Sequence, residues 1–174
     1  MCEEEIIAGC LKENKKAQEV LYHKYAPRMM ALCLRYSRSR EDAEDALMET
    51  FVKVFNNIGK YKHQGSFEGW IKRIAIYTSI DKYNKHKSYV EPLDDKLHDA
   101  QVDDDIYSKL DTQRLLNMIS KLPDGYRFVF NLHVIEDMPH KEIAKLLNIE
   151  EVTSRSQLTK AKRFLRKQIK QNNI

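Results

Sequence analysis

The 174 residues of this chain are 42% hydrophobic and 32% charged, and they include only five glycines and four prolines. So few turn-forming residues argue against an all-β fold. No stretch approaches the roughly 18 apolar residues of a membrane span. The acidic start Met1-Cys-Glu-Glu-Glu is unlike a secretory signal, so we expect a cytoplasmic chain without membrane insertion. The net charge of +4 is small, yet acid and base are segregated, which indicates a polyanion-binding face and a separate acidic segment.

The first zone of the chain, residues 1–87, shows the spacing of amphipathic helices. Apolar residues recur at intervals of three and four from Ala17 to Tyr36, which predicts a helix with one buried face. Pro27 lies inside this run. Because proline removes a backbone donor, we expect a kink or a break near Ala26.

Two further helices are predicted in this zone. Ser39 and Ser66 have side chains that cap helix N-termini, and they precede apolar periodicities over about 41–56 and 67–87. The first of these helices has an acidic face, which carries Asp42, Asp45 and Glu49. Such a face is either solvated surface or a docking site for a basic partner, and the residues alone leave both interpretations open.

Residues 60–87 are basic and contain many aromatic side chains, opposed only by Glu68 and Asp81. A cationic groove lined by aromatic rings holds unpaired nucleic acid, because every base can stack on a ring. Phe67 and Trp70 also fit the apolar stripe of the helix, so a core role is the alternative for them. For the cluster as a whole we favour nucleic-acid binding.

Residues 88–111 differ in composition from the zones on either side. They hold eight acidic residues against two lysines, their periodicity is weak, and Pro92 blocks a regular helix. We therefore expect a flexible acidic linker between two helical modules.

The third zone, residues 112–174, is predicted to be helical again. An apolar stripe begins just before this zone, at Leu110, and continues into it. Its other members are Leu115, Ile119 and Leu122. The sequence Leu122-Pro-Asp-Gly then marks a turn, and a short apolar helix is predicted over 126–135.

Residues 138–166 have the pattern of a helix-turn-helix. Pro139 fits the first turn of one helix, and Asn148 would end that helix in the left-handed conformation that asparagine tolerates. Ile149 would then fill the core, and a second helix would begin near Glu151. The predicted buried residues are Ile143, Ala144 and Leu147 in the first helix and Val152, Leu158, Ala161 and Leu165 in the second.

The exposed face of the second helix is rich in hydrogen-bond donors, and residues 155–170 include no acid. Phosphates favour such a face through counterion release, and its side chains can reach base edges in the major groove. An ordinary hairpin with a solvated basic face is the alternative, but the spacing of Ala144, Asn148 and Ile149 favours DNA binding. The candidate DNA-reading residues are Thr153, Arg155, Ser156, Gln157, Thr159, Lys160, Lys162 and Arg163.

Three motifs stand in order along the chain. They are Asp42-Ala-Glu-Asp-Ala-Leu-Met-Glu-Thr-Phe-Val-Lys-Val-Phe, Phe67-Glu-Gly-Trp-Ile-Lys-Arg-Ile-Ala, and Leu122-Pro-Asp-Gly-Tyr-Arg with the helix-turn-helix. Together they resemble region 2.2, regions 2.3 and 2.4, and region 4 of the sigma-70 superfamily, specifically its small extracytoplasmic-function (ECF) group. The resemblance implies an all-α fold with region 2 in residues 1–87, the linker in 88–111 and region 4 in 112–174.

The resemblance also implies a function, that of a promoter-specific transcription initiation factor that is not an enzyme and needs no cofactor. The residues that would bind core RNA polymerase are Asp42, Asp45, Met48 and Glu49, and Met48 departs from the glutamine common in the family. Those that would hold the melted −10 element are Tyr61, Lys62, His63, Ser66, Phe67, Trp70, Arg73 and Tyr77. The helix-turn-helix would read the −35 duplex, and an anti-sigma factor is a further implied partner.

A conventional helix-turn-helix regulator, which binds duplex DNA without polymerase, is the rival function. DNA affinity in the absence of polymerase distinguishes the two, because a regulator should bind well alone. An enzyme is disfavoured, since the chain has neither a phosphate-cradling glycine loop nor an HExxH pair. Cys2, Cys10 and Cys33 read as free thiols, because none lies at metal spacing from a histidine.

Overall fold

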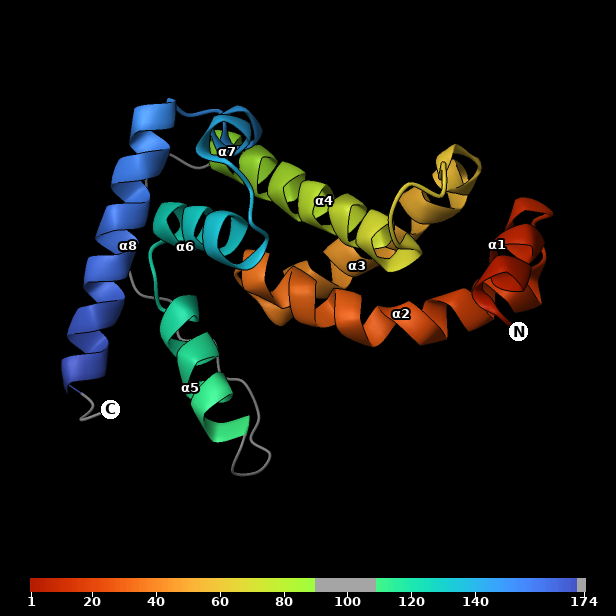
Figure 1. Ribbon diagram of the computed structural model, residues 1–174, viewed down its shortest axis with the longest axis horizontal. Coiled ribbons are helices and arrows are strands. Elements are labelled where there is room, and N and C mark those ends of the chain that lie inside the picture. The colour runs from red at the N-terminus through yellow and green to blue at the C-terminus, as the bar shows by residue number, and fades with distance from the viewer. Residues whose placement is uncertain (90–108, 172–174) are drawn as a thin grey trace. The chain divides into compact units, whose positions relative to one another are not determined.

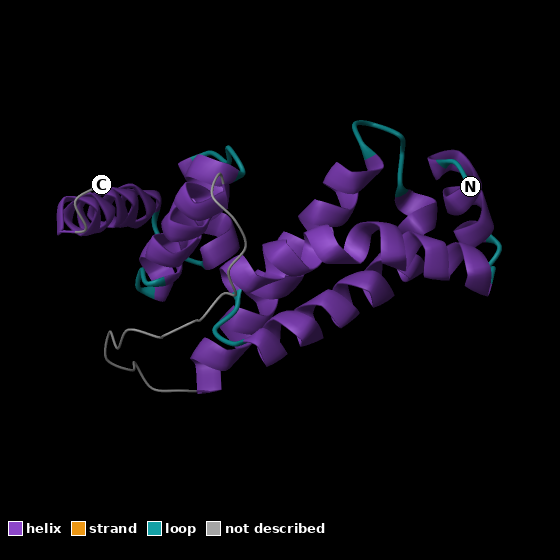
Figure 2. Cartoon of the chain, turned by 90° about the horizontal axis from the view of Figure 1, so that it is seen from below, coloured by secondary structure: helices purple, strands orange, loops and turns teal. Residues whose placement is uncertain are grey.

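The computed structural model describes residues 1–89 and 109–171, and every regular element in these ranges is a helix, as Figures 1 and 2 show. The predicted all-α class is therefore confirmed. The chain divides into two units, Met1–His86 and Lys87–Ile174. Most of the predicted acidic linker, residues 90–108, lies outside the described residues. None of the described helices is both long and apolar enough to cross a membrane.

The first unit is built on one long helix with others packed against it. Its elements are α1 (Glu3–Leu11), α2 (Lys15–Tyr36), α3 (Arg40–Asn57), the 3-10 turn η1 (Ile58–Lys60) and α4 (Phe67–Tyr89). Both α1 and α3 pack on α2. Two predicted caps are confirmed: Ser39 Oγ accepts from the Asp42 amide at 3.0 Å, and Ser66 Oγ from the Gly69 amide at 3.1 Å.

Of the kink or break predicted near Ala26, the break does not occur, because α2 continues through Pro27. Proline leaves the carbonyl of His23 without its helical donor. Both residues are exposed, so water can supply the missing hydrogen bond. Tyr25, Ala26 and Met29 are buried beside them, and their packing holds the helix against the core.

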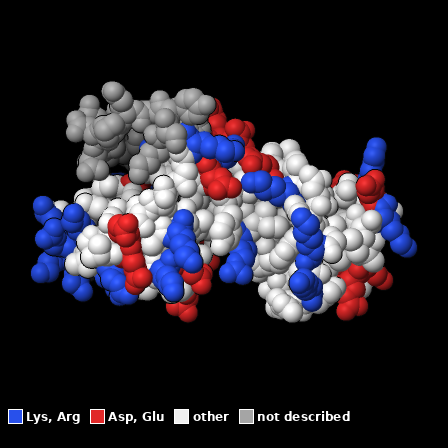
Figure 3. All heavy atoms as spheres, turned by 90° about the horizontal axis from the view of Figure 1, so that it is seen from above, with Lys and Arg blue, Asp and Glu red and all other residues white. Residues whose placement is uncertain are grey.

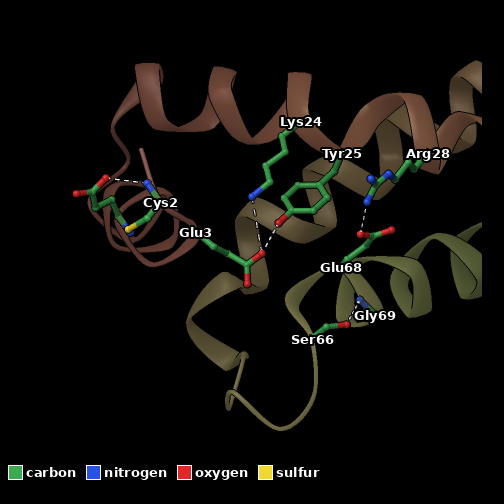
Figure 4. A network of polar contacts seen from close by, with 9 residues as sticks. Cys2, Glu3, Lys24, Tyr25, Arg28, Ser66, Glu68 and Gly69 are labelled. Carbon is green, nitrogen blue, oxygen red and sulfur yellow. Dashed lines mark hydrogen bonds and ion pairs between the residues drawn. The ribbon is translucent and has the colours of Figure 1, made fainter.

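Polar contacts tie α1 and the start of α4 to α2 (Figure 4). The Tyr25 hydroxyl donates to Glu3 at 2.6 Å, and the Arg28 guanidinium donates to Glu68 at 2.6 Å. Burial, followed by the hydrogen bond to Glu3, raises the pKa of Tyr25, so its hydroxyl stays protonated as a donor. The first turn of α4 is thereby fixed to α2 from outside the core.

The second unit packs three helices on the C-terminal one. Its elements are α5 (Lys109–Ser120), α6 (Asp124–Phe130), the π-helical turn η2 (Asn131–Ile135), α7 (His140–Leu147) and α8 (Glu151–Gln171). Helices α5, α6 and α7 all contact α8. One core cluster of this unit consists of Met118, Ile119, Leu122, Ala161 and Leu165.

The predicted stripe on α5 is wrong at one position. Leu115 is exposed, and Met118 is buried with Ile119 and Leu122 instead. The core cluster joins Met118, Ile119 and Leu122 to Ala161 and Leu165 of α8, and Leu115, one turn earlier on α5, does not belong to it. The side chain of Leu110 lies outside the described residues.

Candidate nucleic-acid and partner interfaces

The helix-turn-helix of the second unit forms as the sequence predicts. Asn148 ends α7 in the left-handed conformation, with φ 52° and ψ 53°, which confirms that prediction. The amides of Asn148 and Ile149 both donate to the carbonyl of Ala144. Asparagine tolerates this backbone better than most residues with a side chain, so the turn reverses the chain within three residues.

A histidine pair joins the two helices of this motif. The His140 Nδ1 atom, at the start of α7, lies 2.8 Å from the Oγ of Ser154, which is buried in α8. The ring of His133 stacks on that of His140 with 4.2 Å between ring centroids, and its Nδ1 donates to the carbonyl of Met138 at 2.9 Å. Burial lowers the pKa of His140, and the neighbouring His133 adds to this effect. In residues 1–89 and 109–171, no three His, Cys, Asp or Glu side chains gather to form a metal site.

The outer face of α8 presents most of the predicted DNA-reading residues. The exposed ones are Arg155, Ser156, Thr159, Lys160, Lys162 and Arg163. Arg155 pairs with Glu151 one turn earlier at 2.5 Å, and the hydroxyl of Thr159 donates to the carbonyl of Arg155 at 3.1 Å. Figure 3 shows Lys and Arg side chains gathered at the left, where α8 lies. This face can bind phosphates and reach base edges.

Two side chains of α8 depart from the sequence-based expectation. Val152, predicted to be buried, is 72% exposed. The buried residues of the helix are Ser154, Leu158, Ala161 and Leu165, and Val152 lies two residues before Ser154, on almost the opposite side. The buried position in the first turn therefore belongs to a serine.

Gln157, a predicted DNA-reading residue, is half-buried and packs against Gly125 of α6. A Cβ atom at Gly125 would lie 3.1 Å from its Nε2, so the bare glycine at the start of α6 leaves room for this side chain. Thr153 is half-buried. Neither residue is as open to a duplex as the six exposed side chains of α8.

The acidic face of α3 proves to be mixed with exposed apolar side chains. Met48 and Val52 lie one turn apart and are 58% and 56% exposed. Val52 was missed, although its position four residues after Met48 and off the apolar stripe was a usable signal. An exposed apolar pair among carboxylates is typical of a surface that another protein covers.

The carboxylates of this face have partners within the unit. Lys53 Nζ lies 2.9 Å from Glu49 Oε1, and Lys82 Nζ of α4 lies 3.4 Å from Asp45 Oδ2. The hydrogen bond from Lys53 lowers the pKa of Glu49, so this carboxylate stays charged. Asp42 is half-buried and lines a small hollow of about 170 Å³ between α2, α3 and α4.

The loop between η1 and α4 is held by its own aromatic side chains. The hydroxyl of Tyr61 donates to the carbonyl of Gly65 at 2.8 Å, and the Tyr61 ring lies 5.0 Å from Phe67 and 5.6 Å from Trp70, centroid to centroid. His63 and Gly65 have φ angles of 55° and 88°, in the left-handed region. The loop is therefore ordered by contacts at both of its ends.

Beside this loop, α3, η1 and α4 line an open hollow of about 620 Å³. Its lining residues are Lys53, Asn57, Lys60, Trp70, Arg73, Ile74, Tyr77 and Thr78. Three of these side chains are cationic and two are aromatic rings, the combination that holds unpaired bases and their phosphates. The contributions of Lys53 and Asn57 could not be read from the sequence, because they depend on how α3 packs beside α4.

Phe67 and Trp70 take different positions although their rings stack at 5.6 Å. Phe67 is fully buried, where it also contacts the ring of Tyr25, so the alternative core role describes it. Trp70 is half-buried and lines the hollow. Only Trp70 of this pair offers surface to a ligand.

Comparisons with known proteins cover both units. The family model described as Sigma-70 region 2 matches residues 21–89, and that described as Sigma-70, region 4 matches residues 112–165. The first match contains α3, α4 and the loop between them, and the second contains the helix-turn-helix.

Relatives and solved structures agree with these matches. The chain is 28% identical to the ECF RNA polymerase sigma factor SigM of Bacillus subtilis, covering 84% of this chain and 91% of the relative. It is also 28% identical to SigW of the same organism, covering 84% and 85%. Its fold is similar to that of the sigma factor RpoE from Bartonella quintana, solved in complex with the anti-sigma factor NepR, with a TM-score of 0.56, 16% identity and coverage of 87% and 96%. This chain therefore belongs to the sigma-70 family, as a member of its extracytoplasmic-function group.

Proposed function

We propose that this protein is a promoter-specific initiation factor whose two units divide the work. In the first unit, α3 binds core RNA polymerase and the hollow beside α4 holds the unpaired −10 element. In the second unit, the outer face of α8 reads the −35 duplex. The observation that carries this proposal is that a cationic, aromatic hollow and an acid-free recognition helix occur in separate units of one chain.

The proposed mechanism involves no covalent step, so the protein acts by binding and not as an enzyme. Extracting a base from a duplex costs a few kcal/mol, and stacking on an aromatic ring returns roughly 1–3 kcal/mol per base. Trp70 and Tyr77 supply such rings, and Lys60 and Arg73 supply cations for the adjacent phosphates. Polymerase contacts through α3 would supply the remaining free energy that keeps the strands apart.

The partners follow from the same assignment. Core RNA polymerase and promoter DNA are the primary ones, and we place the protein in the cytoplasm because transcription occurs there. The similar fold of a sigma factor solved with its anti-sigma factor supports an anti-sigma factor as a third partner. A conventional regulator is disfavoured, since it gives no role to the exposed apolar and acidic face of α3.

Charge reversal on α3 tests the polymerase contact. We expect the double variant Asp45→Lys, Glu49→Lys to bind purified bacterial core RNA polymerase more weakly by on the order of tenfold or more, because complementary charges at such an interface would become repulsive. Binding is measured by fluorescence anisotropy of the labelled full-length protein.

The control for this test is the pair Glu4→Lys, Glu19→Lys, which makes the same charge change at exposed sites on α1 and α2. It should bind like the wild type. Equal loss in both double variants would show only a general charge effect and would contradict the assigned face. If the wild-type protein binds no polymerase but binds duplex DNA tightly alone, the rival regulator is correct.

A further inference from the structure

Val152 is the valine that the sequence pattern assigned to the core. At 72% exposure, it is the most exposed large apolar side chain among the described residues. It lies in the first turn of α8, directly after Glu151. A single exposed apolar side chain is common on protein surfaces, so what Val152 does depends on the side chains around it.

The side chains around Val152 indicate which kind of surface would cover it. Its neighbours one turn further along α8 are Arg155 and Ser156, both exposed. The buried face of the helix begins with Ser154 and lies on the other side. Val152 therefore stands at the N-terminal end of the exposed face, where recognition helices of this motif place the side chains that contact base edges.

The chemistry of the side chain selects one base. Valine has no donor or acceptor, so it can recognise only an apolar feature of a base pair. In the major groove, thymine is the only one of the four standard bases with such a feature, its C5-methyl group. Valine is also branched at Cβ and stiff about χ1, so little side-chain freedom is lost when it packs against that methyl group.

We propose that Val152 is a specificity-determining residue of the −35 contact, which recognises a thymine through its C5-methyl group. The proposal rests on the proposed role of α8 as a reader of duplex DNA. The neighbouring Arg155 and Lys160 would hold phosphates or polar base edges, while Val152 excludes water from one thymine.

Replacement of thymine by uracil tests the proposal, because uracil differs only by lacking the methyl group. The full-length protein, assembled with core polymerase, first selects −35 duplexes from a random pool, and each thymine is then replaced singly by uracil. For the wild type we expect one replacement to weaken binding about fourfold, the effect of removing one buried methyl group. Val152→Ala, which removes two methyl groups, should bind the thymine duplex at least about fourfold more weakly and lose the response to uracil at that position.

Val134→Ala is the matched control, since Val134 is also an exposed valine of the second unit but lies in η2, outside α8. It should keep the full response to uracil. The proposal is overturned if Val152→Ala keeps the uracil response, if no single thymine matters to the wild type, or if Val152→Ala weakens binding to polymerase in the absence of DNA. If the wild type selects no −35 sequence at all, the proposed role of α8 fails, which is a separate result.

Discussion

Two aromatic residues in the first turn of α4 show how burial separates structure from function. Phe67 is enclosed in the core of the first unit, whereas Trp70, three residues later, borders the hollow beside α3. The stacked arrangement of the two rings means that the buried one supports the exposed one from behind. Substitution of each should therefore affect a different property of the protein.

We expect Phe67→Ala to lower the free energy of unfolding by about 3–5 kcal/mol, because it leaves a cavity in the core. Trp70→Ala should cost much less stability yet reduce promoter opening, since an unpaired base would lose its stacking surface. Urea denaturation measures the first effect. Permanganate reactivity of unpaired thymines, in complexes with core polymerase, measures the second.

Lys12→Ala is the control for both assays, since Lys12 is exposed and belongs to neither the core nor the hollow. It should change neither the unfolding curve nor the permanganate pattern. Normal permanganate reactivity with Trp70→Ala would show that the base is held elsewhere.

At the scale of elements, one histidine at the contact between α7 and α8 has a lowered pKa, which links the stability of the folded state to pH. Burial and the cations His133 (when protonated), Arg155 and Lys162 lower the pKa of His140 below its ordinary 6.5, while the carboxylate of Glu151 acts in the opposite direction. The folded state thus resists protonation more than the unfolded state does. The stability linked to His140 is complete above about pH 6.5 and is lost as the pH falls through the lower, folded-state pKa.

We therefore expect the second unit to unfold at lower temperature, and −35 duplexes to bind more weakly, as the pH is reduced from 7.5 to 5. His140→Asn should flatten much of this dependence, because asparagine can still reach Ser154 but carries no proton in this range. Thermal unfolding followed by circular dichroism, and anisotropy with a labelled duplex, provide the two readings.

His23→Asn is the matched control, since His23 is exposed on α2. Its pH dependence should equal that of the wild type. If the unfolding temperature and duplex affinity of His140→Asn depend on pH as those of the wild type do, groups other than His140 cause the pH dependence.

Local sequence determines some of these elements and leaves others open. The caps at Ser39 and Ser66 and the turn at Asn148 could be predicted, because each depends on a few adjacent residues. Val152 was misplaced because the prediction treated its apolar character as a sign of burial. The stripe of Leu158, Ala161 and Leu165 continues four residues earlier to Ser154, and Val152 lies about 120° away from Leu158 around the helix. Gln157, which packs against Gly125, depends on a contact between α8 and α6 that periodicity does not contain.

At the scale of the whole molecule, the distribution of charge matters more than its net value of +4. The outer face of α8 stays basic beyond its six exposed candidate DNA-reading residues, through Arg166, Lys167 and Lys170, all exposed. A stripe of cations along one helix neutralises phosphates and releases their counterions. Duplex binding should therefore weaken steeply as salt rises.

For Arg166→Gln combined with Lys170→Gln, we expect the slope of log K against log salt concentration to fall in magnitude by about two, one unit for each lost phosphate contact. Discrimination between selected and scrambled −35 duplexes should stay the same, because these side chains lie beyond the first turns of α8 that reach base edges. Salt titrations with the holoenzyme give both quantities.

Lys15→Gln combined with Lys16→Gln removes the same charge from the exposed start of α2 and should leave the slope unchanged. Equal changes of this slope in the two double variants would show that the net charge of the protein, and not the position of the cations on α8, determines the salt dependence.

The self-bonded loop before α4 has a thermodynamic consequence for promoter opening. A disordered loop would lose roughly 1–2 kcal/mol of backbone conformational entropy for each residue fixed on binding. Here the bond from Tyr61 to Gly65 and the packing of the Tyr61 ring on Phe67 and Trp70 have already ordered the segment during folding. If the loop binds the separated strand as we propose, it has less backbone entropy to lose than a disordered loop would, and the loss of entropy falls mainly on the DNA.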